Sequence, residues 1–256
     1  MGKCFLLGLL SVWFCLEGCN NTSSNPPAFV LHVETSLVVN PTPGNHKATV
    51  VFLHGYRNNG QEMFNNFVNY GFHMGPNVRV VILQARTTDA NPYPGWFPFT
   101  QFPWDEGVTG DLADQADLDR SAAVLLAHLR PEVVALGGDW SKIFLYGLSQ
   151  GGMMSTWMGL MSNMKFGGVV NFVGCLPLMT VGTVSSAGMD MEVIHFHDPL
   201  DPTVPYRFAQ GGYNAALAGG ARHYEPIVQM TEPKEHHHGI ERGAVETANE
   251  WILKRI

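Results

Sequence analysis

The sequence predicts an α/β fold in which helices cover both faces of a mostly parallel central sheet. Short apolar runs rich in β-branched residues alternate along the chain with longer segments of helical periodicity, which is the pattern of strand–helix–strand units. Some of these runs, such as Val80-Val81-Ile82-Leu83, are apolar at consecutive positions, as expected for strands buried on both faces. No internal repeat or low-complexity block interrupts the alternation. We therefore expect one domain over residues 25–256.

The individual elements follow from this alternation in chain order. Apolar, β-branched runs predict strands at 29–39, 48–53, 78–84, 143–148, 168–174, 192–196 and 223–229. Helical periodicity predicts helices at 61–70, 112–136, 151–162, 206–218 and 242–254. Pro41, Pro43 and Gly44 separate the first two strands, because proline and glycine interrupt regular structure.

The connection from Arg86 to Gly110 differs from the others in its length and in its aromatic content. It contains Tyr93, Trp96, Phe97, Phe99, Phe102 and Trp104 among four prolines. Long loops in compact domains are usually functional, often as lids or binding walls. One interpretation is therefore a wall for an apolar acyl chain, with Trp96 and Phe97 in it. The alternative is a surface loop whose aromatic side chains fill a small core of their own.

Composition limits the classes of function. Hydrophobic residues make up 45% of the 256 residues, which excludes disorder as the main state. The formal net charge is −7 and no Lys/Arg cluster exceeds two neighbours, so nucleic acid is excluded as a partner because phosphates require a basic surface. After the N-terminus, no apolar run reaches the ~18 residues that a membrane span requires.

The N-terminus resembles a targeting segment. A short basic start, Met1-Gly2-Lys3, precedes 13 apolar or small residues ending at Leu16, which is typical of a signal peptide. Residues 1–24 are therefore expected to direct the protein out of the cytoplasm, and a lipidated or uncleaved N-terminus that anchors it to a membrane is the alternative. Asn20 and Asn21 each begin a glycosylation sequon.

A candidate nucleophile lies in the pentapeptide Gly147-Leu148-Ser149-Gln150-Gly151. The G-x-S-x-G pattern is weak alone, but here an apolar strand precedes it and a helical run follows, as in a nucleophile elbow. Glycine is required on either side because a side chain there would meet the neighbouring backbone in the strained turn. Ser149 would also lie beside a helix N-terminus, which favours an oxyanion.

A serine nucleophile needs a general base and an orienting carboxylate, in the chain order Ser, Asp/Glu, His. The carboxylate is expected in the segment after the strand at 192–196, where Asp198 and Asp201 are both candidates. The base is expected in the triplet His236-His237-His238, directly before the last helix.

Two backbone N–H groups are expected to form an oxyanion hole. One belongs to Gln150, the residue after the nucleophile, and the other to Tyr56 in the loop after the strand at 48–53. His54 precedes Tyr56 in the same loop, and we expect it to hold the backbone there rather than to act as the base.

Several stretches together resemble the acyl-protein thioesterase / phospholipase–carboxylesterase family of α/β-hydrolases. The matching stretches are Val51-Phe-Leu-His-Gly55, Gly95-Trp96-Phe97, Gly147-Leu-Ser-Gln-Gly-Gly152, Leu176-Pro177-Leu178 and Asp201-Pro-Thr-Val-Pro205. The resemblance implies the α/β-hydrolase fold and a triad of Ser149, Asp201 and His238, with His237 as the fallback base. It also implies hydrolysis of carboxylic esters, thioesters or lysophospholipids, without a cofactor.

The chain departs from this family's pattern in places. Asp198 stands where the family usually has glycine, the histidine triplet replaces Gly-His-Ser, and Arg57-Asn58-Asn59 replaces a turn with glycine and aspartate. A leader is unusual in a family whose familiar members are cytosolic.

The sequence thus predicts a serine hydrolase that acts through an acyl-enzyme on esters or thioesters with an apolar acyl group. Its partners would be small-molecule or lipid esters or acylated proteins, and neither cofactor nor metal is expected. One alternative is a zinc hydrolase that uses His195, His197, Asp198 and the histidine triplet. The other is a binding protein that keeps the fold without the chemistry.

Overall fold

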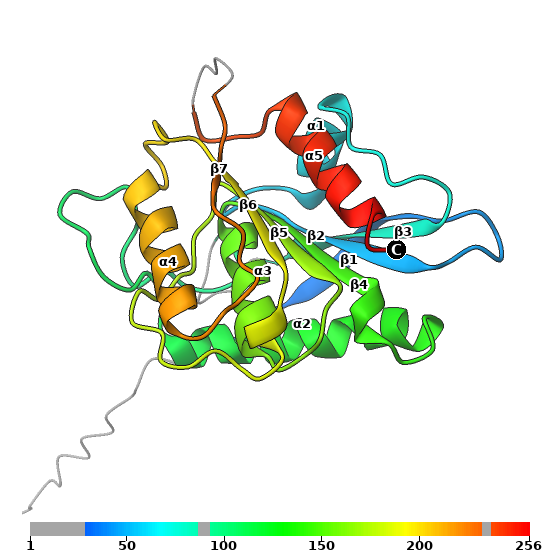
Figure 1. Ribbon diagram of the computed structural model, residues 1–256, viewed down its shortest axis with the longest axis horizontal. Helices are drawn as coiled ribbons and strands as arrows, with labels where there is room; N and C mark the ends of the chain where they lie inside the picture. The colour runs from blue at the N-terminus through cyan, green and yellow to red at the C-terminus, as the bar shows by residue number, and fades with distance from the viewer. Residues whose placement is uncertain (1–28, 87–92, 232–236) are drawn as a thin grey trace, which may run out of the picture.

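The computed structural model describes residues 29–86, 93–231 and 237–256 of the chain (Figure 1). The expected leader at 1–24, with Asn20 and Asn21, lies outside the described residues. Among the described residues, no helix has both the length and the apolar character needed to cross a bilayer.

The described residues form a central sheet of seven strands with the order β1-β3-β2-β4-β5-β6-β7. The strands are β1 (Val33–Val39), β2 (Ala48–Leu53), β3 (Val78–Ala85), β4 (Ile143–Leu148), β5 (Gly168–Phe172), β6 (Val193–His197) and β7 (Val228–Gln229). Only β1 runs antiparallel to its neighbour, β3, and the remaining pairs are parallel. The predicted mostly parallel sheet is confirmed.

Helices cover both faces of this sheet, as predicted (Figure 1). They are α1 (Gly60–Asn69), α2 (Gln115–Ala135), α3 (Gln150–Met161), α4 (Tyr206–Ala218) and α5 (Arg242–Leu253), with 3-10 turns at Trp140–Lys142 and Gly188–Asp190. Side-chain caps fix the starts of α1 and α2. The Asn59 side chain accepts hydrogen bonds from the N–H groups of Gln61 and Glu62, and the Asp114 side chain accepts from those of Ala116 and Asp117.

Two hydrophobic cores result, because successive side chains of a strand point to opposite faces of the sheet. On β2, Val50 and Phe52 belong to the core beneath α1 and α5, while Val51 and Leu53 belong to the core beneath α2, α3 and α4. Every residue of β2 is buried. This two-sided burial explains why the central strands are apolar without alternation.

Three predicted strands are longer in the sequence than in the structure. The first begins at Val33 instead of residue 29. The strand predicted at 168–174 ends at Phe172, since Val173 adopts a left-handed φ of 48°. The strand predicted at 223–229 is reduced to an isolated bridge at Tyr224 and the short β7. Pro226 lies between these two pairings and has no N–H to donate.

Candidate active site

Ser149 lies in a sharp turn between the end of β4 and the start of α3. Its φ of 54° and ψ of −120° lie outside the regions that residues with a side chain favour, and its N–H is held by the Phe172 carbonyl at 2.8 Å. Its side chain forms no capping hydrogen bond to α3. The strained turn therefore presents the hydroxyl at the carboxyl end of the sheet, where ligands bind in open α/β folds.

The flanking glycines allow this turn because backbone atoms occupy the space of a side chain. A Cβ on Gly147 would lie 2.2 Å from the Gly151 carbonyl oxygen, and one on Gly151 would lie 2.0 Å from the Leu53 oxygen. Contacts this short are steric overlaps. Packing against the backbone therefore requires glycine at both positions, as the sequence predicted.

Asp201 lies in the loop after β6 and is almost completely buried. Its Oδ1 accepts hydrogen bonds from the N–H groups of Thr203 and Val204, at 2.8 and 2.9 Å. These two bonds fix the carboxylate within its own loop. The other oxygen, Oδ2, lies 2.7 Å from His238 Nδ1.

His238 connects this carboxylate to the serine. A carboxylate only accepts hydrogen bonds, so His238 Nδ1 carries the proton that it donates to Asp201. The unprotonated Nε2 then lies 3.0 Å from Ser149 Oγ and accepts from it. The side chain of His238 is 19% exposed. The structure thus brings the three predicted residues into one hydrogen-bonded chain and leaves the His238 side chain partly exposed to solvent.

The loop that carries Tyr56 lies against the nucleophile. A Cβ on Gly55 would lie 3.4 Å from Ser149 Cβ, so this backbone is in van der Waals contact with the turn. Gln150 is the first residue of α3, and the first N–H groups of a helix have no partner within it. The N–H groups predicted for the oxyanion hole therefore come from segments that border Ser149.

His54, the first residue of this loop, is completely buried. Its Nδ1 donates to the Gly55 carbonyl at 2.7 Å, while Nε2 accepts from the Ala85 N–H at 3.0 Å and from the Gln84 amide at 3.1 Å. Burial lowers the pKa of His54 to about 4, and the bond to Gly55 opposes that shift in part. A neutral imidazole with both nitrogens bonded holds the loop in place.

Trp96 and Phe97, predicted as an acyl-binding wall, have no solvent-exposed surface. The Trp96 indole donates to the His54 carbonyl at 2.6 Å. The Gln150 side chain accepts from the Trp96 N–H at 2.9 Å and donates to the Phe97 carbonyl at 2.8 Å. These two residues thus fasten the long connection to α3 and to the His54 loop, and side chains with no exposed surface cannot line an open wall.

The other aromatic side chains of this connection pack against one another. Phe99 and Phe102 meet at 5.4 Å between ring centroids, and Phe102 stacks on Trp104 at 4.5 Å. The outer end of the cluster is open, because Trp104 is 41% exposed. The alternative of a self-packed loop therefore describes most of the cluster. Residues 87–92 of the connection lie outside the described residues.

The two histidines of β6, which prompted the zinc alternative, are buried and bonded to protein atoms. His195 Nδ1 lies 3.0 Å from the Tyr224 hydroxyl, His195 Nε2 lies 3.2 Å from His197 Nδ1, and His197 Nε2 lies 2.8 Å from the Val204 carbonyl. Burial lowers the pKa of both imidazoles. In the described part of the chain, no three His, Cys, Asp or Glu residues are grouped as metal ligands.

Asp198 and His237, the alternative acid and base, form a pair of their own beside the triad. His237 Nδ1 lies 3.0 Å from Asp198 Oδ2. Sequence reasoning treated these two residues only as substitutes and did not predict their contact. It also did not predict that the Gln84 side chain bonds His54 or that the Gln150 side chain bonds the backbone of the long connection. A polar residue within a buried strand or at a helix start was the available signal, because buried polar groups need partners.

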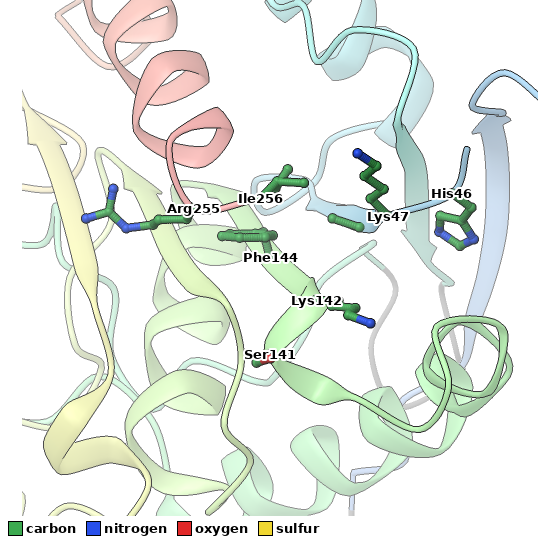
Figure 2. Close-up of a pocket in the computed structure, with 8 residues that line it drawn as sticks. His46, Lys47, Ser141, Lys142, Phe144, Arg255 and Ile256 are labelled. Carbon is green, nitrogen blue, oxygen red and sulfur yellow. The ribbon is translucent and has the colours of Figure 1, made fainter. Parts of the chain in front are cut away.

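A cavity of about 420 Å³ lies at the opposite ends of the strands from Ser149 (Figure 2). Its lining includes Lys47, Lys142, Phe144 and Arg255, at the amino ends of β2 and β4. Ser149 follows the carboxyl end of β4. The six residues of this strand span about 20 Å, at ~3.3 Å per residue, between the cavity and Ser149. The cavity is therefore separate from the candidate active site.

Several known proteins are similar to this chain in sequence or in structure. The chain is 28% identical over 180 residues to acyl-protein thioesterase 1 of Schizosaccharomyces pombe, a match that covers 66% of this chain and 75% of that protein. The Arabidopsis thaliana SOBER1 structure superposes with a TM-score of 0.66 at 18% identity over 81% of this chain and 98% of that one. Acyl-protein thioesterase 2 of Zea mays gives 0.64 at 18% identity over 88% and 98%. At such identity, the structures show the shared fold.

The secreted or extracytoplasmic location expected from residues 1–24 is wrong. The relatives that the chain matches are acyl-protein thioesterases from fungi and Dictyostelium. As stated above for the resemblance, the familiar members of this family are cytosolic. The membrane-anchored alternative was based on the same residues. An apolar run of this length also occurs in segments that are not exported, so its length and composition misled the prediction.

The family itself is shown by a match that extends over most of the chain. The sequence pattern of the phospholipase/carboxylesterase family matches residues 34–254, which includes nearly all of β1 and all of α5. The sheet order, the turn at Ser149 and the relatives agree with this match. The chain therefore belongs to the phospholipase/carboxylesterase family of α/β-hydrolases and is a hydrolase of the esterase/thioesterase class.

Proposed function

We propose that the chain hydrolyses carboxylic esters or thioesters with an apolar acyl group through a Ser149–His238–Asp201 triad and an acyl-enzyme intermediate. The observation that carries this proposal is the continuous chain of hydrogen bonds from Asp201 Oδ2 through His238 to Ser149 Oγ, at 2.7 and 3.0 Å. These lengths lie within the range that proton transfer between a nucleophile and its base requires.

The first half of the reaction is acylation of the serine. His238 Nε2 takes the proton of Ser149 Oγ as the oxygen attacks the acyl carbon, and Asp201 stabilises the imidazolium that results. The N–H groups of Tyr56 and Gln150 stabilise the negative charge on the substrate oxygen, with help from the N-terminus of α3. His238 then protonates the leaving alcohol or thiol, and the acyl group remains on Ser149.

The second half is hydrolysis of the acyl-enzyme. His238 Nε2 takes a proton from water, which attacks the same acyl carbon, and the proton returns to Ser149 Oγ as the carboxylic acid leaves. Every proton in this scheme passes through one nitrogen of His238. Its partly exposed side chain allows water to reach it.

The names of the relatives suggest the substrate class. Several are called acyl-protein thioesterases, and we propose that S-acylated proteins or peptides are among the substrates of this chain. A thioester and an oxygen ester place their acyl carbon against the same serine and the same N–H donors, so the triad serves both. Lysophospholipids present the same kind of oxygen ester.

The test uses the full chain with p-nitrophenyl esters, an S-acylated peptide and a lysophospholipid, each at several acyl lengths. Ser149→Ala is expected to abolish turnover and labelling by a fluorophosphonate, whereas Ser186→Ala, at an exposed serine, leaves both unchanged. Asp201→Asn is expected to lower kcat by about 10⁴-fold, because it favours the wrong imidazole tautomer.

Two results would contradict the proposal. Turnover that persists in Ser149→Ala rules out the serine mechanism. A folded wild-type chain that neither turns over any substrate nor reacts with the fluorophosphonate would instead be a binding protein on this fold.

A further inference from the structure

The loop after β6 contains two aspartates that bond in the same way to two consecutive histidines. Asp198 uses Oδ1 to accept the Leu200 N–H at 2.8 Å and Oδ2 to bond His237. Asp201 uses Oδ1 for the Thr203 and Val204 N–H groups and Oδ2 for His238. Each carboxylate thus fixes its own turn with one oxygen and holds a histidine with the other.

Two consecutive side chains reach this loop only because the backbone turns at His237. In extended chain, successive side chains point to opposite sides. His237 has a φ of 50°, in the left-handed region that residues with a Cβ seldom adopt and that must be held by surrounding contacts. The bond to Asp198 is a contact of this kind.

The burial of the two partners shows how they are matched. The Asp198 side chain is 4% exposed, and that of His237 is 35% exposed. A carboxylate with so little access to water needs donors from the protein, and Leu200 N and His237 Nδ1 supply them. The loop of Asp198 is also tied to the triad, because the Asp201 N–H donates to the Asp198 carbonyl at 3.1 Å.

We propose that Asp198 and His237 form a positioning pair that holds the left-handed backbone at His237 and thereby sets His238 against Ser149. This inference rests on the proposed function, because it assigns the pair a role through His238. The pair would not exchange protons with the substrate. Asp198 stands where the family usually has glycine. The pair is therefore one of the features in which this chain differs from the family's pattern.

The test measures kcat and KM of the full chain with a p-nitrophenyl ester, together with the rate of fluorophosphonate labelling. His237→Ala is expected to lower kcat and the labelling rate by about 10- to 100-fold, since a misplacement of ~1 Å at a catalytic group can cost 10² in rate. KM is expected to stay within about twofold, because the pair acts on a catalytic group and not on substrate binding.

A conservative variant separates positioning from general damage. In His237→Asn the amide Nδ2 occupies the branch position of His237 Nδ1, and asparagine accepts left-handed φ more readily than other residues with a side chain. We expect its kcat to remain within about threefold of wild type. His237→Gln places its amide one bond further out and is expected to behave like His237→Ala. His223→Ala, at an exposed histidine paired with Asp190, is the control with wild-type kinetics.

The two partners should also act as one unit. Asp198→Ala combined with His237→Ala is expected to lower kcat no further than either change alone. Circular dichroism and thermal unfolding verify that each variant is folded, and the partly exposed His237 carries the test if Asp198→Ala does not fold. The proposal is overturned if His237→Ala keeps wild-type kcat, if His237→Asn and His237→Ala lose equally, or if the double variant shows additive losses. Failure of the proposed function is a different result, since Ser149→Ala would then remain active.

Discussion

His54 makes the stability of the fold depend on pH. It is completely buried, and both ring nitrogens bond to groups that require the neutral form with the proton on Nδ1. Burial lowers its pKa from 6.5 to about 4. The folded chain therefore binds fewer protons at this site than the unfolded chain does, and its stability rises with pH between these two values.

The size of the effect follows from the two pKa values. The stability that His54 contributes is present above pH 6.5 and is lost as the pH falls toward 4. Between pH 7 and pH 5 the linkage relation gives a loss of about 2 kcal/mol in the free energy of unfolding. His195 and His197 are also buried with lowered pKa values, so they change stability in the same direction.

Urea denaturation at pH 7 and at pH 5 measures this loss. His54→Gln keeps an acceptor but does not titrate, so its loss between the two pH values is expected to be smaller than that of wild type by about 2 kcal/mol. Comparing each variant with itself removes the packing cost of the substitution. His223→Gln, at an exposed histidine, should match wild type. An equal loss in wild type and His54→Gln would refute the reasoning.

Two further substitutions test how the site is built. Gly147→Ala places a Cβ 2.2 Å from the Gly151 carbonyl oxygen and is expected to lower the free energy of unfolding by about 3 kcal/mol. Gly182→Ala is the control, because it has open space around it. Equal urea midpoints for the two variants would show that the clash at Gly147 does not destabilise the fold. Gln150→Glu removes the donor to the Phe97 carbonyl and places a charge in a buried site, at an expected cost of about 2–3 kcal/mol at pH 7. The exposed Gln210→Glu is its control, and an unfolding temperature unchanged by Gln150→Glu would show that this bridge does not hold the long connection.

The parts that the sequence predicted well are those that depend on local pattern. The central strands are recognisable because burial on both faces requires consecutive apolar residues, and β2 and β4 have the predicted bounds. The turn at Ser149 is recognisable because the clashes at Gly147 and Gly151 exclude every other residue. The edge of the sheet was predicted less well. There, pairing depends on which N–H groups are available, and Pro226 removes one.

The long aromatic connection shows why residue type alone did not assign a role. Aromatic side chains fill a core as readily as they line a binding site, and their pattern is the same in both cases. The tertiary structure buries Trp96 and Phe97 completely, with hydrogen bonds to His54 and Gln150. Targeting was mispredicted for a related reason, because a short apolar run has no single meaning without its context.

The sequence by itself determined the fold class, the strained serine turn and the family, because periodicity, glycine spacing and short motifs express constraints between near neighbours. Only the tertiary structure decided which aspartate meets which histidine. The resemblance had selected Asp201 and His238, but the residues left the choice open, since Asp198, Asp201 and the histidines lie far apart along the chain. The left-handed turn at His237 brings both pairs to one loop. A contact of this kind depends on the position of backbone segments in space, which no local pattern records.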